Sequence, residues 1–426
     1  MKTKLLIFGI TGDLSTRKLL PALKAITDTG DFDDLSIIGI SRREVDVKKL
    51  LENSLGDTSL EDRISIVTMN LDNADDYTHL KAQIKLQDDE QLVTYLSVPP
   101  NASTQIVDFM GEAGLNTPNV KILFEKPFGV DLKSAKDVIK RTARYYDENQ
   151  LYRIDHYLAK EMTQNIAAFR GGNAIFSHLW SNNFIESINI VASETIGIEG
   201  RTQFYEQTGA LRDLVQGHLM QLLSLTLMDI PNDFEWQELP ELRLAALKQL
   251  EPVDPAKTIR AQYEGYKDEV DNPDTQTETF VSIELQSNDS NWLGVPIHLI
   301  TGKGLDKKAT EVQIHLKKTR DAQSNCITFK IQPNEGIRIE LFTKKPGYAH
   351  EFETRVLGFN YAEGEKIPDA YEQVIVDAIH SRKSLFTSSP EVLRSWELLA
   401  DLQRTWDTDK TPIAIYDKGS DIDSIS

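Results

Sequence analysis

The first 150 residues of the chain alternate between short apolar segments and amphipathic ones. Five of the apolar segments have the length and composition of buried strands: KLLIFG, LSIIGIS, ISIVTMNL, LVTYLSV and KILFE. Between them, stretches such as VDVKKLLENSL and VDLKSAKDVIKRTARYY repeat apolar residues every three or four positions, as one face of a helix does. This alternation predicts a parallel, doubly wound sheet whose ligand crevice lies at the carboxyl ends of its strands.

The pattern changes after about residue 155. A helical stretch (EMTQNIAAFR), a strand-like one (ESINIVASE) and a long apolar helix (GALRDLVQGHLMQLLSLTLMD) come first. Alternating runs then follow with no helix between them, as in an antiparallel sheet: TETFVSIELQ, GVPIHLIT, EVQIHLKK, ITFKIQ and IRIELFT. Two helix patterns follow, DAYEQVIVDAIHS and PEVLRSWELLADLQRTW. We predict a Rossmann-like α/β domain over 1–155 and a larger α+β domain over 156–426, with a mostly antiparallel sheet flanked by helices.

Composition narrows the classes of partner. The 426 residues are too many for one ordinary core, and a 40% apolar share is enough to build sizeable ones. A net charge of −19 argues against nucleic acid or an anionic membrane as partner, so an anionic substrate would need cations gathered locally. The single cysteine, Cys326, excludes an internal disulfide framework and fits the cytoplasm. We expect no signal peptide, since the first apolar run ends at Ile10, and no membrane span, since no apolar stretch is long enough to cross a bilayer.

A glycine turn follows the first predicted strand. In FGITGDLSTRKLLPAL, Gly9 and Gly12 would let the backbone approach a pyrophosphate, although glycines at strand ends are also commonly plain turns. The second strand ends before Arg42 and Arg43 rather than before the acid typical of an NAD site, and arginine suits a 2′-phosphate. The alternative to a 2′-phosphate site is that both arginines are simply exposed in a loop and bind nothing. We expect NADP, with NAD possible as a secondary cofactor, and the expected cofactor-binding residues are Gly9, Thr11, Gly12, Asp13, Leu14, Arg42, Arg43 and Lys126.

The fifth predicted strand ends in FEKPFG. Lys126 precedes Pro127 on the crevice side of the sheet, where a group close to the nicotinamide is expected. A lone lysine at this position is more often an ordinary strand-end charge. A cis peptide bond before Pro127 is conceivable, because proline makes that isomer accessible.

RIDHYLAKE, from Arg153 to Glu161, is rich in ionisable side chains. On a helix, His156 and Lys160 would share a face, and with Tyr157 between them they could bind a phosphate monoester. By charge pattern alone, a salt-bridged surface helix is the better interpretation.

A histidine lies on the apolar face of the helix predicted in GALRDLVQGHLMQLL. His218 could be a satisfied core residue or a general base. At about 100° per residue, Asp213 falls roughly 140° round the helix from His218, so it would line the same pocket only from the side, or be solvated. The helical stripe contains Leu211, Leu214, Val215, His218 and Leu222.

Five ordered motifs together resemble the glucose-6-phosphate dehydrogenase family: FGITGDLSTRKLLPAL, FEKPFG, YRIDHYLAKE, GALRDLVQGHLMQ and ITGKGLDKKATEVQI. The resemblance spans Lys4 to about Trp406 and implies the same two-domain fold. It implies oxidation of β-D-glucose 6-phosphate at C1 to 6-phosphoglucono-1,5-lactone, with hydride passing to NADP, as the first step of the oxidative pentose phosphate pathway. It also implies a homodimer or homotetramer that associates through the sheet.

Roles carried over by motif follow from this resemblance. His218 resembles the general base and Asp155 the carboxylate that orients it. Arg42 resembles the arginine for the 2′-phosphate, and Lys126 a lysine that reaches between cofactor and substrate. No metal is expected. The substrate-binding residues that the resemblance implies are His156, Tyr157, Lys160, Glu194, Asp213, Lys303, Lys308 and Lys126.

The sequence departs from the family pattern at several positions, none of which is a proposed catalytic group, and two other interpretations stay open. Gly217 replaces an asparagine beside His218, Ala102 and Ser103 follow Pro99-Pro100 where an aromatic residue is usual, and IAIYDKGSD replaces the usual ending. One alternative is a dehydrogenase of another sugar or sugar phosphate on the same fold. The other is a catalytically silent dinucleotide sensor, against which the presence of His218, Asp155 and Lys160 argues.

Overall fold

The computed structural model describes residues 2–231, 233–319, 324–362 and 364–425. The chain forms two compact units: Met1–Ala159 with Pro368–Val392, and Lys160–Ile367 with Leu393–Ser426. The division between them lies four residues later in the chain than the predicted end of the first domain at 155. The structure differs more from the prediction in the segment Pro368–Val392, which was expected in the second domain and belongs to the first unit.

A seven-stranded sheet forms the first unit, in the order β15-β6-β5-β4-β1-β2-β3. All neighbouring strands are parallel except β15, which is antiparallel to β6. The strands are β1 (Lys2–Phe8), β2 (Leu35–Ser41), β3 (Ile64–Thr68), β4 (Glu90–Leu96), β5 (Val120–Phe124), β6 (Leu151–Ile154) and β15 (Phe386–Thr387). The helices are η1 (Ser15–Leu19), α1 (Leu20–Thr27), α2 (Val47–Leu55), η2 (Glu61–Arg63), α3 (Ala74–Ile84), α4 (Pro100–Glu112), α5 (Leu132–Thr142), η3 (Glu148–Gln150) and α12 (Ala370–Ile379).

The returning segment belongs to the core of the first unit. Val374, Ile375 and Ala378 of α12 are fully buried in the same cluster as the side chains of β1 and α1. The buried Lys121 ammonium donates to the Ala378 carbonyl at 2.6 Å, and burial lowers the pKa of Lys121 to about 8. These residues are more than 250 positions apart in the chain, so no local pattern could predict that they meet.

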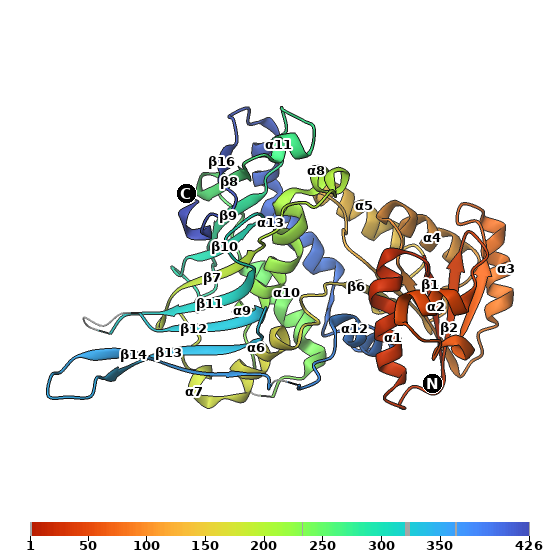
Figure 1. Cartoon of the computed structure of the whole chain (residues 1–426), viewed down its shortest axis with the longest axis horizontal. Coiled ribbons are helices and arrows are strands. Elements are labelled where there is room, and N and C mark those ends of the chain that lie inside the picture. The colour runs from red at the N-terminus through yellow and green to blue at the C-terminus, as the bar shows by residue number, and fades with distance from the viewer. Residues whose placement is uncertain (1, 232, 320–323, 363, 426) are drawn as a thin grey trace. The chain divides into compact units, whose positions relative to one another are not determined.

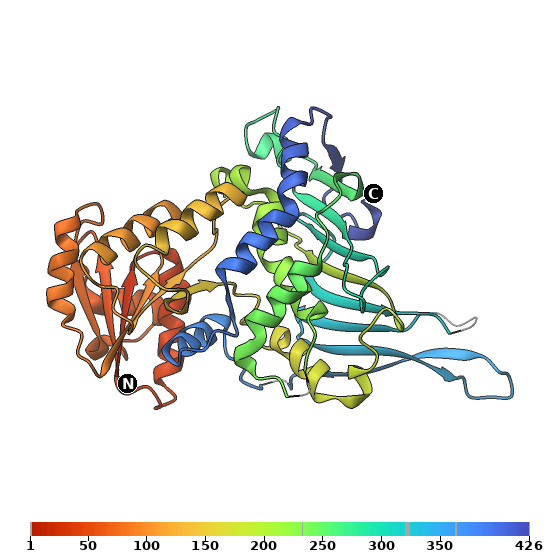
Figure 2. The same ribbon diagram turned by 180° about the vertical axis from the view of Figure 1, so that it is seen from behind.

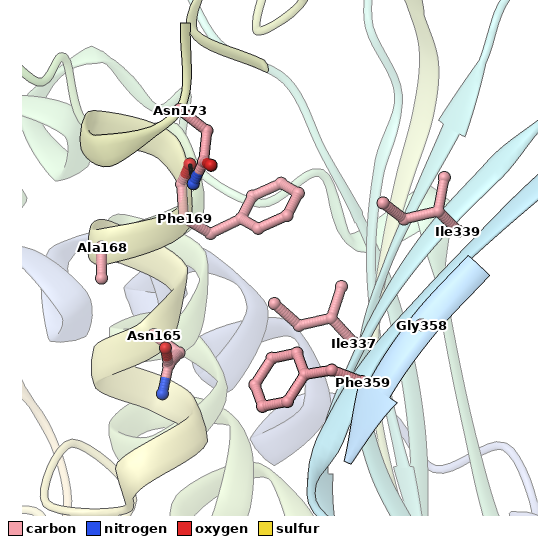
Figure 3. Close-up of a pocket in the computed structure, with 8 residues that line it drawn as sticks. All are labelled: Asn165, Ala168, Phe169, Asn173, Ile337, Ile339, Gly358 and Phe359. Carbon is pink, nitrogen blue, oxygen red and sulfur yellow. Dashed lines mark hydrogen bonds between the residues drawn. The ribbon is translucent and has the colours of Figure 1, made fainter. Parts of the chain in front are cut away.

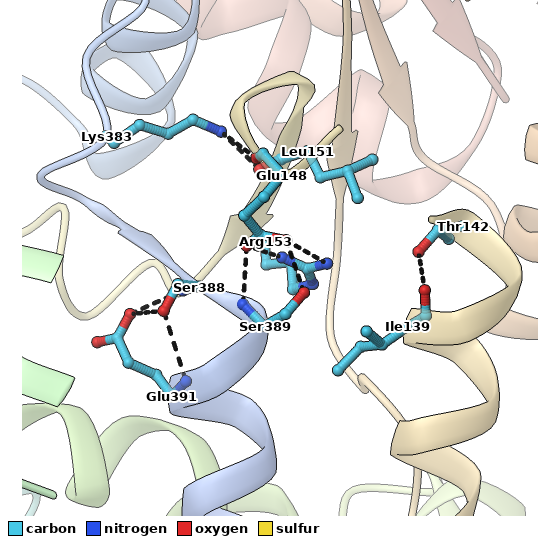
Figure 4. Close-up of polar contacts among 9 residues, drawn as sticks. All are labelled: Ile139, Thr142, Glu148, Leu151, Arg153, Lys383, Ser388, Ser389 and Glu391. Atoms are coloured by element: carbon cyan, nitrogen blue, oxygen red, sulfur yellow. Dashed lines mark hydrogen bonds and ion pairs between the residues drawn. The ribbon is translucent and has the colours of Figure 1, made fainter. Parts of the chain in front are cut away.

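A polar cluster around Glu148 fixes the far end of the same segment (Figure 4). The Glu148 carboxylate pairs with Arg153 at 2.8 Å and accepts from the Ser389 backbone N–H at 2.8 Å and hydroxyl at 2.6 Å. Lys383 donates to the Leu151 carbonyl at 2.6 Å, and burial lowers its pKa to about 7. Segment 368–392 is therefore attached by both apolar packing and ionic contacts.

A nine-stranded sheet forms the second unit, in the order β14-β13-β12-β11-β7-β10-β9-β8-β16. Among the described strands of this second sheet, only the β7–β10 and β8–β16 pairs are parallel, and the other neighbouring pairs are antiparallel. The strands are β7 (Ile185–Ser193), β8 (Thr258–Tyr263), β9 (Phe280–Leu285), β10 (Ile297–Gly302), β11 (Ala309–Leu316), β12 (Cys326–Gln332), β13 (Gly336–Lys344), β14 (Phe352–Asn360) and β16 (Ala414–Tyr416).

Helices α6, α9 and α10 lie on one face of this sheet (Figures 1 and 2). The helices of the second unit are α6 (Glu161–Gly172), α7 (Ala174–Ser177), α8 (Thr202–Ala210), η4 (Leu211–Leu219), α9 (Met220–Leu227), η5 (Trp236–Glu238), α10 (Leu239–Gln249), η6 (Pro255–Lys257), α11 (Tyr266–Glu269), α13 (Ser389–Thr408, which begins in the first unit) and η7 (Ile422–Ser424). None of the helices in the described residues is both long and apolar enough to cross a bilayer.

The predicted fold class, a parallel Rossmann-like domain joined to a mostly antiparallel sheet flanked by helices, is confirmed. Strands β6, β8, β14, β15 and β16 were not predicted. β14 is exposed along nearly its whole length, so its sequence lacks the alternation that burial on one face imposes. β6 is short and buries all four residues, including Arg153, so it has no apolar signature.

Candidate active site

The glycine turn after β1 is tightly built. Gly9 has φ +81°, and a Cβ on it would lie 2.2 Å from the Ser97 carbonyl oxygen, so only glycine fits. The Gly9 carbonyl accepts from the Gly12 N–H at 2.9 Å and from the Ser15 hydroxyl at 2.8 Å. Helical backbone begins at Asp13, and the first N–H groups of a helix have no partner within it. The turn therefore suits a pyrophosphate at the helix start.

The other expected cofactor-binding residues of this turn differ in exposure. Thr11 and Asp13 are exposed, and Asp13 pairs with Arg17 at 2.7 Å. Leu14 is partly buried and packs against the core of the unit, so its side chain is structural. Its backbone, rather than its side chain, is what this turn offers to an anion.

Arg42 and Arg43 lie exposed immediately after β2. The Arg43 N–H donates to the Ser41 hydroxyl at 3.2 Å, which fixes the turn in which both arginines lie. β2 is the direct neighbour of β1, so the arginines and the glycine turn share the carboxyl edge of the sheet. Exposed guanidinium groups at this place fit a 2′-phosphate and leave the ribose without the usual acid.

At the end of β5, Lys126 precedes Pro127 in a cis peptide bond. Its neighbour Glu125 lies outside the set expected from the sequence. The Tyr95 hydroxyl donates to the Glu125 carboxylate, and burial raises the pKa of Glu125 to about 7, with the charge of Asp155 adding to the rise and that of Lys126 opposing it. A carboxylate at a strand end gives no sign of burial in the sequence, so it could not be singled out.

RIDHYLAKE is not a helix, and the prediction of a shared helical face for His156 and Lys160 is wrong. The chain leaves β6 at Ile154, turns, and begins α6 at Glu161. The buried Asp155 carboxylate accepts from the Tyr157 N–H at 3.0 Å, which closes the turn. His156 and Lys160 lie in the turn between β6 and α6, so the helical spacing does not apply to them. Asp155, His156 and Tyr157 end the first unit at the carboxyl edge of its sheet, and Lys160 opens the second.

In the second unit, three of the expected residues lie at neighbouring strand ends along one edge of the sheet, formed by β7, β10 and β11. Ser193 of β7 pairs with both Gly302 of β10 and Ala309 of β11, which places Glu194, Lys303 and Lys308 side by side. The Lys303 ammonium donates to the Glu194 carboxylate. Lys303 is 3% exposed, whereas Lys308 is exposed.

Lys160 lies near another carboxylate of the second unit. Burial raises the pKa of Glu335, and the charge of Lys160 opposes that rise, so the two groups are neighbours. Glu335 lies in the turn after β12, and Gln332, at the end of that strand, donates to the Thr310 hydroxyl at 3.1 Å, next to Lys308. The end of β12 thus lies beside the start of β11, which Lys308 precedes.

His218 and Asp213 lie on η4, which is a π-helix rather than the expected α-helix. In a π-helix the hydrogen bonds join residues five apart, so residues at that spacing lie nearly above one another. Asp213 and His218, five apart, therefore share a side of the helix, and the angle of about 140° holds only for an α-helix. His218 is 5% exposed, and η4 packs against β7 and β10.

The chain breaks its helical geometry just before η4. Gly209 has φ +59°, and a Cβ on it would lie 2.4 Å from Glu278 Oε1. The same buried carboxylate accepts from the Leu211 N–H at 2.9 Å, so it satisfies a donor at the helix start. Nothing in the local pattern around His218 signals this π geometry.

Both parts of the chain match known protein families. Residues 6–165 match the family described as "Glucose-6-phosphate dehydrogenase, NAD binding domain", and residues 167–423 match "Glucose-6-phosphate dehydrogenase, C-terminal domain". Glucose-6-phosphate 1-dehydrogenase of Borreliella burgdorferi is 33% identical over 440 residues, covering 94% of this chain and 91% of the relative. The Bacillus subtilis protein of the same name is 32% identical, covering 98% and 94%.

Solved structures of glucose-6-phosphate dehydrogenases are similar to this chain over nearly its whole length. A structure described as "Glucose-6-phosphate dehydrogenase in complex with its substrate glucose-6-phosphate" has a TM-score of 0.91 at 30% identity and covers 99% of this chain and 95% of its own. Glucose-6-phosphate 1-dehydrogenase from Mycobacterium avium has a TM-score of 0.87 at 28% identity, with 98% and 94% covered. Because both halves match the same family and relatives above 30% identity run along nearly the whole chain, the chain belongs to the glucose-6-phosphate dehydrogenase family.

Proposed function

We propose that this protein oxidises β-D-glucose 6-phosphate at C1 to 6-phosphoglucono-1,5-lactone and passes the hydride to NADP, the first step of the oxidative pentose phosphate pathway. The observation that supports this most directly is the full-length likeness to a family member that holds glucose 6-phosphate, at a TM-score of 0.91. The single cysteine further supports a place in the reducing cytoplasm.

His218 is the proposed general base. When C1 loses hydride, its oxygen becomes a carbonyl oxygen and the hydroxyl proton must leave, so a positioned base lowers the barrier. An imidazole titrates near neutral pH and can hold this proton. Asp155 is assigned to orient the imidazole and to stabilise its cationic form. NADP, when bound, accepts the hydride.

The remaining residues bind the substrate and the cofactor. The glycine turn and Arg42, with Arg43, hold the pyrophosphate and the 2′-phosphate. Glu194 and Asp213 accept hydrogen bonds from sugar hydroxyls, and Lys126 reaches between cofactor and substrate. The proposed phosphate and sugar contacts come from His156, Tyr157, Lys160, Lys303 and Lys308.

A steady-state assay tests the reaction. We expect glucose 6-phosphate to reduce NADP rapidly, and unphosphorylated glucose to do so at least 100-fold less efficiently, because the lysines have no phosphate to bind. Comparable efficiency on both sugars would favour a dehydrogenase of another sugar on this fold. The absence of turnover with either sugar would favour the dinucleotide sensor.

Lys160→Ala is expected to raise the KM for glucose 6-phosphate by about 10- to 100-fold, since a charge-assisted hydrogen bond is worth about 1.5–3 kcal/mol. Activity on unphosphorylated glucose should change far less. Lys307→Ala, which removes an exposed lysine beside Lys308, is the matched control and should leave both parameters near the wild type. Equal losses on both sugars would argue against a phosphate contact.

Arg42→Ala is expected to raise the KM for NADP by about 10- to 100-fold and to leave the KM for NAD nearly constant, because NAD lacks the 2′-phosphate. Initial rates with each coenzyme at saturating glucose 6-phosphate give the ratio of the KM for NADP to the KM for NAD. Lys48→Ala, an exposed cation on the neighbouring helix α2, controls for a general charge effect. An unchanged NADP/NAD ratio in Arg42→Ala would rule out the 2′-phosphate role.

We also propose that the protein forms a homodimer or homotetramer through its larger sheet. β14 is an edge strand, and Phe352 and Leu357 on it are 73% and 58% exposed. Phe169 of α6, Ile337 of β13 and Phe359 of β14 line a mostly apolar pocket of about 410 Å³ (Figure 3). Sedimentation equilibrium at micromolar concentration would show a dimer or tetramer; a monomer would contradict the proposal.

A further inference from the structure

A buried tyrosine lies under the ammonium of Lys303. Lys303 Nζ is 5.4 Å from the centroid of the Tyr205 ring, within the range of a cation–π interaction. Tyr205, on α8, is 1% exposed, and Lys303 is 3% exposed, so water screens this pair little. The same ammonium donates to Glu194, so it is held between a ring face and a carboxylate.

The ring is itself held rigidly. It packs edge-on against Tyr266 at 6.2 Å, and the Tyr266 hydroxyl donates to the Glu206 carboxylate at 2.5 Å. Both tyrosines belong to one buried cluster with Tyr263 and Phe280. Tyr205 therefore presents a fixed face to the lysine.

The hydroxyl of Tyr205 plays a different part from its ring. Within the described residues this buried hydroxyl has no hydrogen-bond partner, and burial, with the nearby charge of Asp213, raises the pKa of Tyr205 well above its ordinary value. A buried hydroxyl without a partner is unfavourable. The contact with Lys303 therefore comes from the aromatic face and not from the hydroxyl.

The backbone of Lys303 is fixed as well. Its carbonyl accepts from the Tyr416 hydroxyl at 2.6 Å, and its N–H donates to the Thr279 carbonyl at 3.0 Å. Tyr416 comes from IAIYDKGSD, the ending that departs from the family pattern. The four-carbon stem of Lys303 is flexible in itself, and the contacts of its ammonium restrict rotamers that would otherwise be lost only on binding an anion.

We propose that Tyr205 is a positioning residue for Lys303: its ring face holds the ammonium beside Glu194, at the sheet edge where the phosphorylated sugar binds. This inference rests on the proposed function. Preorganising a cation lowers the ordering cost at binding, so its loss weakens substrate binding more than turnover.

The test compares two substitutions at this position. Tyr205→Leu removes the ring and is expected to raise the KM for glucose 6-phosphate about tenfold with kcat lowered less than threefold. Tyr205→Phe keeps the ring and should restore the wild-type KM. Phe329→Leu, which removes a fully buried ring on β12, is the control for a general loss of packing and should not reproduce this split.

A double-mutant cycle gives a readout without substrate. Urea unfolding of Tyr205→Leu, Lys303→Met and the double variant should show at least fivefold coupling in the unfolding equilibrium constant. Absence of coupling, or a KM for Tyr205→Phe as high as that for Tyr205→Leu, would overturn the positioning role. A wild-type protein inactive on glucose 6-phosphate would instead overturn the proposed function, and the cycle would still report whether the ring holds the ammonium.

Discussion

Replacing His218 with asparagine is expected to lower kcat by about 10²- to 10⁴-fold and to change the KM for glucose 6-phosphate little, because a positioned general base contributes that much to proton transfer. Asparagine keeps a polar group on η4 but cannot take up a proton. Since the phosphate contacts are assigned to other residues, among them Lys160, and not to His218, the sugar should still bind.

Initial rates over a range of pH would measure this effect. The wild type should lose activity as the pH falls and the imidazole becomes protonated, and His218→Asn should lose that dependence together with its rate. His298→Asn, which changes a half-buried histidine on β10, is the matched control and should retain wild-type kcat. A kcat for His218→Asn within threefold of the wild type would end the assignment of the base.

Gly9→Ala is expected to destabilise the first unit strongly and to remove cofactor binding. A left-handed backbone alone costs an L-residue about 1–2 kcal/mol. The added Cβ would also lie 2.2 Å from the Ser97 carbonyl oxygen, which belongs to the backbone and cannot move aside cheaply. We expect a loss of about 3–4 kcal/mol in the free energy of unfolding and a large rise in the KM for NADP.

Gly30→Ala separates the two contributions. Gly30 has φ +80°, almost the value at Gly9, but a Cβ there would meet nothing within 4 Å. Urea unfolding should therefore show a loss of only about 1–2 kcal/mol for Gly30→Ala. Equal losses for the two variants would show that backbone strain, and not the close approach to Ser97, makes Gly9 necessary.

Features that depend on short stretches of sequence could be predicted. The runs that become β1, β2, β4 and β5 are almost continuously apolar because both faces of a parallel sheet are covered, and this marks them as strands. The glycine turn and the two arginines could be singled out because each comes directly after a predicted strand, β1 and β2 respectively. Their place at one edge of the sheet needed only the rule that parallel strands share their carboxyl ends.

Features that depend on distant pairing could not be predicted. The contact between Lys303 and Glu194 exists because β10 lies parallel to β7, more than 100 residues earlier in the chain. The return of 368–392 to the first unit depends on Lys121 and Glu148, which no periodicity links to α12 or to Ser389. The relation of Asp213 to His218 depends on the π-helix η4, which the local pattern around His218 does not signal.

Transfer of deuterium from the substrate tests the central claim most directly. With [1-²H]glucose 6-phosphate and NADP, each turnover should place one deuterium on the reduced coenzyme, because the hydride comes from C1. Mass spectrometry of the coenzyme measures the label, and NADP with unlabelled substrate is the control. Reduced coenzyme without deuterium, or no reduction of NADP, would contradict the proposed reaction.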